Sequence, residues 1–264
     1  MFTRHPRNTS FHWEMPKPPY RALSTRQARE YDETGAFLLA AAFTAAEMDE
    51  VSDAIAPFEK ATEDALRKLE GGRYLIAKAD AITFTTHLVG KSEALRRFSR
   101  HPVFQDLCHD LMGPNARLYW DQAVYKKPGN PEEFPWHQDN GYTYVEPQQY
   151  LTCWVALNDA TEENGCPWVV PGLHRNGTLV HETTPLGYQC LRNPQGAVAM
   201  PARKGDIVVF SSLTPHRTGP NLSQGVRQAY ILQYAPQGAL AFPPGASEGI
   251  AQEDPSRQYH VDTH

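Results

Sequence analysis

The second half of the chain is a succession of short β-type segments separated by turn-forming residues, and this pattern limits the fold more than any other feature. Glycine, proline and asparagine are frequent between the segments, and no helical pattern intervenes. Strands at this spacing predict an antiparallel sandwich or barrel. The segments are ARLYWDQAVYKK (116–127), YLTCWVAL (150–157), PWVV (167–170), DIVVFS (206–211) and RQAYILQY (227–234).

The first half carries helical patterns instead. Thr44 and Glu47 have the spacing of a capping box, and apolar residues then recur at helical intervals, which predicts a helix from about Ala45 to Leu69. A second helical stretch, 92–112, ends at a Gly-Pro pair, and we expect Pro102 to divide it. Segments 35–43 and 73–84 have the composition of strands.

The two ends of the chain lack such patterns. Residues 1–24 are rich in proline and are predicted to form an extended arm, and residues 235–264 are predicted to be loop or tail. Neither an internal repeat nor a linker is evident, so residues 1–264 are expected to form a single domain. Helices followed by strands fit a mainly β domain whose core is covered by helices.

Charge and composition exclude several classes of protein. The net charge of −5 argues against nucleic-acid binding, which needs a basic face. No segment approaches the roughly 18–20 consecutive apolar residues of a membrane span, and the N-terminus lacks the apolar stretch of a secretory signal. The cysteines form no C-x-x-C pair, and buried thiols in the cytoplasm are the simplest interpretation; they are Cys108, Cys153, Cys166 and Cys190.

The segment FPWHQDNGYTY (134–144) contains the most informative motif. If its backbone is extended, His137 and Asp139 project from the same face and offer an imidazole and a carboxylate to a divalent metal. A second histidine would complete the two-histidine, one-carboxylate set of non-haem Fe(II) oxygenases. The alternative is that the two side chains are simply solvated at the end of a strand, because a chain with 11 histidines contains H-x-D pairs by chance.

Three downstream histidines are candidates for the third ligand. His174 lies in a turn that it could simply stabilise, and His181 has no supporting neighbours. His216 comes just after the apolar run DIVVFS, where it could reach into the mouth of a barrel. Arg227 begins the last strong strand and could form a two-pronged hydrogen bond with a dicarboxylate, although an arginine at a strand start is more often solvated.

Together these motifs resemble the phytanoyl-CoA dioxygenase family of Fe(II)- and 2-oxoglutarate-dependent oxygenases. The resemblance covers about residues 34–235 and leaves the arm and the tail outside. It implies a double-stranded β-helix, a cupin-like jelly roll with helices packed on one sheet. It is carried by GPNARLYWDQAVYKKPG, WHQDNGY, LTCWVALNDATEENGCPWVVPGLHRNG and KGDIVVFSSLTPHRTGPNLSQGVRQAYILQY.

The resemblance also implies roles for individual residues. His137, Asp139 and His216 match the iron ligands. Arg227 matches the arginine that pairs with the distal carboxylate of 2-oxoglutarate. Further positions match contacts to this cosubstrate, although a strand lysine such as Lys78 is more often solvated and a tryptophan in an apolar run such as Trp154 is more often core; they are Thr218, Trp154, Gln122 and Lys78.

The implied reaction consumes Fe(II)-bound O2 and 2-oxoglutarate, releases succinate and CO2, and hydroxylates a small or medium-sized organic metabolite. The carboxylate of Asp139 favours hydroxylation over halogenation, in which relatives have a small residue there. Desaturation, epimerisation and ring rearrangement stay open, as does a non-catalytic jelly-roll metal-binding protein or a zinc hydrolase. The sequence indicates no oligomeric state.

The substrate is expected to meet residues that follow the H-x-D pair or come from the N-terminal half. Their mixture suggests a partly apolar molecule, and no basic cluster for a CoA phosphate is evident. The alternative is that the tyrosines pack on the outer sheet. The candidates are Phe84, Asn140, Tyr142 and Tyr144.

Overall fold

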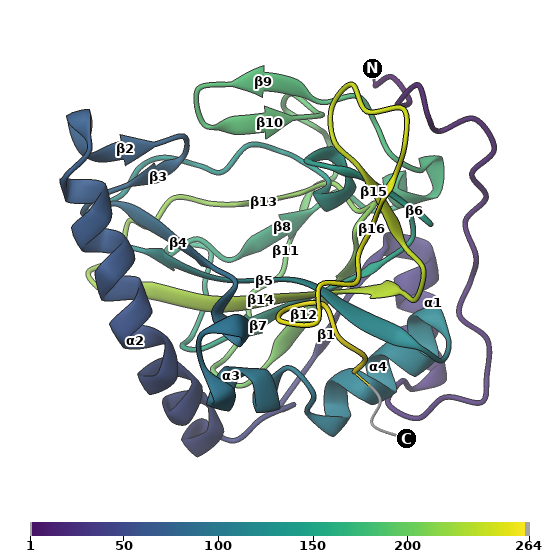
Figure 1. Ribbon diagram of the computed structural model, residues 1–264, viewed down its shortest axis with the longest axis horizontal. Helices are drawn as coiled ribbons and strands as arrows, with labels where there is room; N and C mark the ends of the chain where they lie inside the picture. The colour runs from purple at the N-terminus through teal and green to yellow at the C-terminus, as the bar shows by residue number, and fades with distance from the viewer. Residues whose placement is uncertain (1, 262–264) are drawn as a thin grey trace.

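The computed structural model describes residues 2–261, which are built around a twisted eight-stranded antiparallel sheet (Figure 1). The strand order is β1-β12-β7-β14-β5-β4-β3-β2. Neighbours in this sheet are mostly distant in sequence, so the sheet joins both halves of the chain. Its strands are β1 (Ala36–Leu39), β2 (Arg73–Tyr74), β3 (Ala77–Lys78), β4 (Ile82–Thr86), β5 (Ala116–Lys126), β7 (Leu151–Ala156), β12 (Ile207–Ser211) and β14 (Arg227–Pro236).

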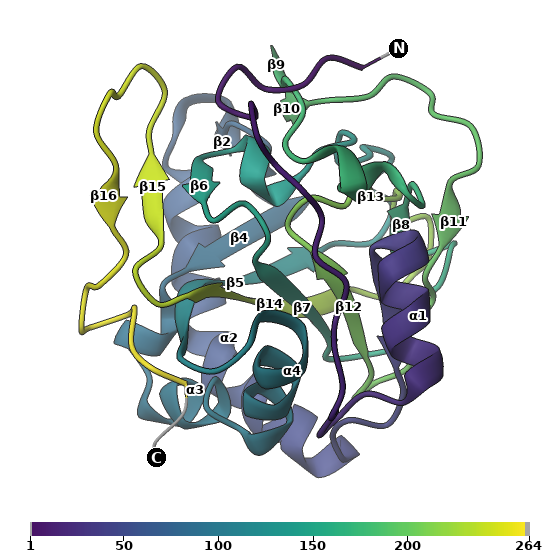
Figure 2. The ribbon, with the colours of Figure 1, turned by 90° about the vertical axis from the view of Figure 1, so that its right-hand side faces the viewer.

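A smaller sheet faces one side of the large one. It has the order β11-β8-β13, with β11 (Val198–Ala199), β8 (Pro167–Val169) and β13 (His216–Thr218), all antiparallel. Figures 1 and 2 show this small sheet lying over β5, β14, β7 and β12. Two antiparallel sheets packed in this way form a double-stranded β-helix, and the predicted fold class is confirmed.

The large sheet is buried on both faces. On β12, Ile207 and Val209 belong to the core between the sheet and the helices, whereas Val208 and Phe210 belong to the core between the two sheets. This division follows from the period of two in a strand, in which successive side chains point to opposite faces. It also explains why the strand sequences are almost continuously apolar rather than alternating.

Helices cover the other face of the large sheet, as Figure 1 shows. The capping box at the start of α2 is confirmed: Thr44 Oγ1 accepts from the backbone N–H of Glu47, whose carboxylate accepts from the N–H of Thr44. Pro102 is the first residue of α4, where its missing N–H costs no hydrogen bond, so the expected division is confirmed. The helices are α1 (Thr25–Thr34), α2 (Ala45–Arg67), α3 (Glu93–Phe98) and α4 (Pro102–Met112), with short 3₁₀ helices η1 (Glu70–Gly72), η2 (Leu88–Gly90), η3 (Asp139–Gly141) and η4 (Leu173–Asn176).

Two elements of the first half differ from the sequence analysis. Helix α1 was not predicted, although Ser24 and Gln27 form a capping box at its start. The strand expected over 73–84 is divided into β2, β3 and β4, because Leu75 and Asp80 adopt left-handed backbone conformations with φ of 51° and 62°. Such residues turn the chain and end a strand.

The ends of the chain pack against the β-helix. The N-terminal arm forms an isolated bridge between Arg4 and Leu179. The prediction of loop or tail after residue 235 was wrong in part, because two strands there form a sheet with β6 and because Tyr259 and Val261 are buried. The remaining strands are β6 (Tyr144–Glu146), β9 (Glu182–Thr184), β10 (Gly187–Gln189), β15 (Leu240–Phe242) and β16 (Ile250–Ala251). Within residues 2–261, no helix combines the length and apolar character that a bilayer crossing requires.

Candidate active site

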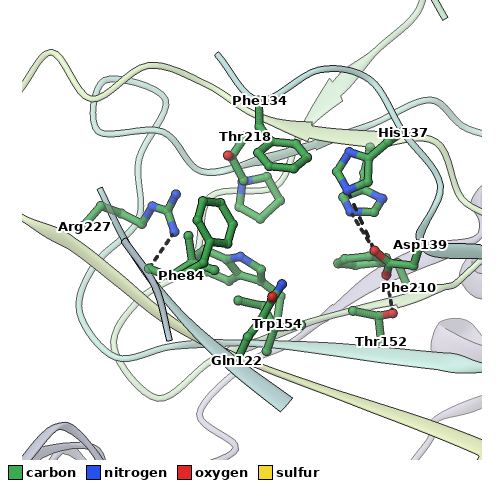
Figure 3. Close-up of a pocket in the computed structure, with 14 residues that line it drawn as sticks. Phe84, Gln122, Phe134, His137, Asp139, Thr152, Trp154, Phe210, Thr218 and Arg227 are labelled. Carbon is green, nitrogen blue, oxygen red and sulfur yellow. Dashed lines mark hydrogen bonds and ion pairs between the residues drawn. The ribbon is translucent and has the colours of Figure 1, made fainter. Parts of the chain in front are cut away.

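Three side chains with metal-ligand atoms meet between the two sheets (Figure 3). His137 and His216 form an isolated antiparallel bridge, in which each backbone N–H donates to the other residue's carbonyl at 2.9 and 2.8 Å. Asp139 begins η3, and its Oδ1 lies 3.8 Å from Nε2 of His137 and 3.7 Å from Nε2 of His216. The three ligand atoms lie within 4.8 Å of one another. The structure therefore brings together three of the residues predicted from the sequence.

Both imidazoles are held with Nε2 facing the centre of this cluster. Nδ1 of His137 lies 2.8 Å from the carbonyl of Pro135, and Nδ1 of His216 lies 3.0 Å from the carbonyl of Thr214. Because a carbonyl can only accept, each Nδ1 carries the proton and each Nε2 offers a lone pair. Two such imidazoles and one carboxylate are a donor set that fits a divalent transition metal.

Electrostatics favour the neutral, ligating form of His137. Burial, together with the proximity of His216, holds the pKa of His137 well below its usual value of 6.5. Asp139 is held by Thr152 on β7, whose Oγ1 donates to Oδ2 of the carboxylate at 2.6 Å. Thr152 stands in an apolar run and was not predicted as a site residue.

The turn that carries the H-x-D pair is supported from behind by Gln138 and His181. Gln138 is fully buried; its amide nitrogen donates to the carbonyls of Gly177 and Leu213, and its amide oxygen accepts from the N–H of Leu179. Nε2 of His181 accepts from the backbone N–H of Gln138 at 2.9 Å. His181 therefore supports the turn rather than joining the ligand cluster.

His174, the other alternative ligand, lies elsewhere. Its Nε2 bonds the carbonyl of Asp32 at 3.1 Å, and its ring packs edge-on against Trp13. It stabilises the contact between η4 and α1, which is the structural role that its position in a turn suggested.

Arg227 is a buried cation in the same pocket. It is fully buried, and its Nη1 makes one long hydrogen bond of 3.4 Å to the carbonyl of Val124. Nε and Nη2 have no hydrogen-bond partner, and within residues 2–261 no carboxylate forms an ion pair with it. Burial lowers the pKa of Arg227 to about 10, and its guanidinium lies 5.4 Å from the ring centre of Trp154. An unpaired buried guanidinium is costly, so this arrangement fits an anionic ligand.

Other predicted residues line the same pocket, and Figure 3 shows them around it. They are Phe84, Gln122, Trp154 and Thr218. Their contributions come from β4, β5, β7 and β13, so both sheets build the pocket. Large apolar side chains and a few polar groups are typical of a small-molecule site.

A family model described as phytanoyl-CoA dioxygenase (PhyH) matches residues 31–229. The chain belongs to the phytanoyl-CoA dioxygenase family. The matched region contains the three candidate ligands and Arg227 and excludes the arm and the tail, in agreement with the resemblance noted from the sequence.

Two named relatives resemble this chain over about two thirds of its length. Phytanoyl-CoA dioxygenase domain-containing protein 1 of Danio rerio is 30% identical over 185 residues, which are 66% of this chain and 62% of that protein. Methylphosphonate hydroxylase of Gimesia maris is 27% identical over 67% of this chain and 63% of its own length. This chain therefore spans about three fifths of either relative.

A solved structure shares the fold. The epimerase SnoN, in complex with Fe3+, alpha ketoglutarate and nogalamycin RO, has a TM-score of 0.71 and 22% identity, and the match covers 90% of this chain and 98% of that one.

Four residues that the sequence analysis assigned to the site lie outside the pocket lining. Lys78 is on β3 at the edge of the large sheet. Asn140 is fully buried, and its amide bonds the backbone of Val145 and the hydroxyl of Thr178. An extended backbone would already place Asn140 on the face opposite Asp139, and η3, which begins at Asp139, buries its side chain. Tyr142 packs its ring edge-on against His137 at 5.3 Å, and Tyr144 is buried against the arm, where its hydroxyl donates to the carbonyl of Arg7.

Lys126 is a buried residue that was not predicted to take part. It is opposite Arg227 in the pairing of β5 with β14, and its Nζ donates to the carbonyls of Gly219 at 2.5 Å and Glu132 at 3.2 Å. Burial, together with the charge of Arg227, lowers its pKa to about 6. Lys126 therefore ties the chain after Thr218 to the loop that precedes the H-x-D pair.

Proposed function

We propose that this protein is an Fe(II)- and 2-oxoglutarate-dependent oxygenase that hydroxylates a small organic molecule. The observation that carries the proposal is one pocket that holds both a two-histidine, one-carboxylate cluster and an unpaired buried guanidinium. A metal-binding protein without a cosubstrate would have no need for the second feature. The named activities of relatives, methylphosphonate hydroxylase among them, are compatible with this reaction class.

In the proposed enzyme, Nε2 of His137, Nε2 of His216 and Oδ1 of Asp139 hold the iron. These three side chains would hold Fe(II) and leave room at the ion for cosubstrate and O2. When bound, Fe(II) with O2 supplies the oxidation in which 2-oxoglutarate loses CO2 to become succinate and one oxygen atom enters the substrate.

The residues of the chain bind and orient the reactants. Arg227 pairs with the distal carboxylate of 2-oxoglutarate, to which the hydroxyl of Thr218 donates a further hydrogen bond. Trp154 packs beside the guanidinium and keeps water from it. Phe84 and Phe210 add apolar walls, which exclude water from the reacting groups.

We also propose that the protein acts in the cytoplasm on a small molecule rather than on nucleic acid. Cys153 and Cys166 are buried thiols that form no disulfide within residues 2–261, as expected in a reducing compartment. The net charge of −5 supports the second part.

The test is an anaerobic titration of the protein with Fe(II) and 2-oxoglutarate. We expect a weak visible charge-transfer band, and succinate formation once air is admitted. His216→Ala should abolish both, whereas His12→Ala, at an exposed histidine of the arm, should preserve both. Succinate formation by the His216 variant would overturn the proposed ligand set, and a zinc-dependent activity without 2-oxoglutarate would indicate a hydrolase instead.

A further inference from the structure

We propose that the substrate is an uncharged aromatic compound that carries a carbonyl or hydroxyl oxygen. The inference rests on the proposed function and names the substrate class of the same pocket. Three observations carry it: a continuous row of partly exposed aromatic rings whose middle members contact the metal cluster, the charge balance of the pocket, and an amide nitrogen of Gln122 that lacks a protein partner.

The row of rings consists of Phe84, Phe134, Tyr142 and Tyr188, and is called the aromatic wall below. Phe134 lies 5.9 Å from Phe84 and 6.4 Å from Tyr142 between ring centres. Tyr142 in turn lies 5.1 Å from Tyr188, edge-on. The four residues come from β4, the loop before the H-x-D pair, the turn after η3, and β10, so distant parts of the chain converge here.

The middle of the aromatic wall contacts a candidate iron ligand. The ring of His137 lies 4.5 Å from that of Phe134 and 5.3 Å from that of Tyr142. A ring stacked on the wall would therefore be held next to the metal. All four wall residues keep part of their surface exposed, and contiguous exposed aromatic surface beside a pocket is typical of a binding site for a flat apolar ligand.

The charges of the loaded pocket already balance. The ferrous ion and Arg227 are positive, Asp139 and the 2-oxoglutarate dianion are negative, and together they cancel. The other residues that line the pocket are uncharged. Nearby charges are already engaged: Arg73 pairs with Glu132, and Arg217 pairs with Glu133. A charged substrate would be buried without a partner, which costs far more free energy than an uncharged one.

In this inference Gln122 donates a hydrogen bond to the substrate, in place of the cosubstrate contact that the family resemblance implies. Its Oε1 accepts from Nε1 of Trp120 at 3.3 Å. Because an indole N–H can only donate, this contact settles which end of the amide faces Trp120. Nε2 then has no hydrogen-bond partner among residues 2–261, and Gln122 lines the pocket. A free amide N–H selects an acceptor, such as a carbonyl or hydroxyl oxygen.

The experiment compares three probes with the same ring system: naphthalene-2-carboxamide, 2-naphthoate and naphthalene. Binding is measured by isothermal titration to the anaerobic protein loaded with Fe(II) and 2-oxoglutarate, and to the metal-free protein with 2-oxoglutarate. We expect the carboxamide to bind more tightly than naphthalene by about 2- to 12-fold, the range of one hydrogen bond. We expect it to bind at least about 10-fold more tightly than the anion 2-naphthoate.

Substitutions test whether Gln122 and the aromatic wall bind the probes. Gln122→Leu should remove the advantage of the carboxamide over naphthalene and leave naphthalene binding within about 2-fold. Phe134→Leu should weaken both neutral probes by about 2- to 12-fold, the range of one aromatic contact. Phe58→Leu is the matched control: Phe58 packs against the core on the helix side of the large sheet, and its change should leave probe binding as in wild type.

Tighter binding of 2-naphthoate than of the carboxamide, or equal binding to wild type and Phe134→Leu, would overturn the inference. Neither result would affect the proposed function, because the charge-transfer band of Fe(II) and 2-oxoglutarate is recorded without any probe. Absence of that band would instead refute the proposed function, whatever the order of the probes.

Discussion

Oγ1 of Thr152 donates a 2.6 Å hydrogen bond to Oδ2 of Asp139, while Oδ1 of the same carboxylate faces the two imidazoles. Thr152 lies on β7 of the large sheet, and Asp139 lies in the loop beside the small sheet. The hydrogen bond therefore connects the two layers at the candidate metal ligand. It leaves one carboxylate oxygen for an ion and fixes the direction in which that oxygen points.

Thr152→Val should lower the affinity for Fe(II) by about 10- to 100-fold, which is the usual effect of losing a group that orients a metal ligand. Valine keeps the shape of threonine, so a change in affinity reports the lost hydrogen bond. The measurement is an anaerobic Fe(II) titration at saturating 2-oxoglutarate, followed through the charge-transfer band. Thr152→Ser retains the hydroxyl and should stay near wild type, and equal affinities of the valine and wild-type proteins would contradict the role.

Arg227→Met should have opposite effects on stability and on cosubstrate binding. Without 2-oxoglutarate the buried guanidinium lacks a carboxylate, so an apolar side chain of similar length should raise the free energy of unfolding by about 1 kcal/mol or more. The same change removes the partner of the distal carboxylate and should weaken 2-oxoglutarate binding by at least about 10-fold.

Denaturant unfolding and calorimetric titration with 2-oxoglutarate measure the two effects. Arg217→Met is a matched control, because Arg217 is already paired with Glu133 and lies over the rings of Trp136 and Trp168. It should destabilise the protein and leave 2-oxoglutarate binding near wild type. A loss of stability in Arg227→Met would show that the guanidinium has a partner that the proposal does not include.

The stability of the metal-free protein should fall as the pH is lowered from 6.5 towards 4. Burial lowers the pKa of His174 to about 4, whereas an unfolded histidine titrates near 6.5. Between these values only the unfolded chain takes up the proton, so the stabilisation is complete above pH 6.5 and is lost as the pH falls. For His174 alone the loss is about 2 kcal/mol at pH 5.

Urea unfolding at pH 7, 6 and 5 tests this expectation. His174→Gln should reduce the pH dependence by about that amount, whatever its effect at pH 7, because glutamine does not titrate. His12→Gln, at an exposed position, should keep the wild-type dependence. An identical pH dependence in wild type and His174→Gln would show that His174 does not stay neutral in the folded protein.

Asp139 and Asn140 show which parts of the candidate site could be predicted from the sequence and which could not. The period of two in a strand, together with the positions of His216 and Arg227 beside apolar runs, was sufficient to predict side chains that the fold brings into one pocket. Asn140 was expected to face the substrate because it follows the H-x-D pair, but alternation places it opposite Asp139, and the 3₁₀ turn that begins at Asp139 buries it. The Asn140-Gly141 pair is a turn signal that this expectation did not use.

Side-chain contacts that depend on which strands pair could not be predicted from the sequence either. Thr152 reads as one polar residue in an apolar strand, and Lys126 reads as a surface lysine. Their roles follow from the tertiary arrangement, because Lys126 is opposite Arg227 in the strand pairing and Thr152 reaches Asp139 from the large sheet. The strands β15 and β16 were missed for a related reason: they are short, and the pairing of β15 with β6, rather than a local pattern, makes them strands.

The N-terminal arm should contribute to the active site through Asn8, although it lies outside the region that matches the family. Asn8 is buried, and its Nδ2 donates to the carbonyls of Asn176 at 2.7 Å and Thr178 at 3.1 Å. The hydroxyl of Thr178 accepts from the amide of Asn140, the neighbour of Asp139. A chain of buried hydrogen bonds thus runs from the arm to the H-x-D turn.

Asn8→Ala would leave these buried carbonyls without their donor, so we expect a loss of about 1–3 kcal/mol in stability and weaker Fe(II) binding, because the turn that presents Asp139 loses support. Thermal unfolding and the anaerobic Fe(II) titration measure the two effects. Ser10→Ala, at an exposed position on the same arm, should change neither. If Asn8→Ala unfolds earlier but binds Fe(II) as tightly as wild type, the arm stabilises the fold without supporting the metal ligand, and the proposed connection to Asp139 is wrong.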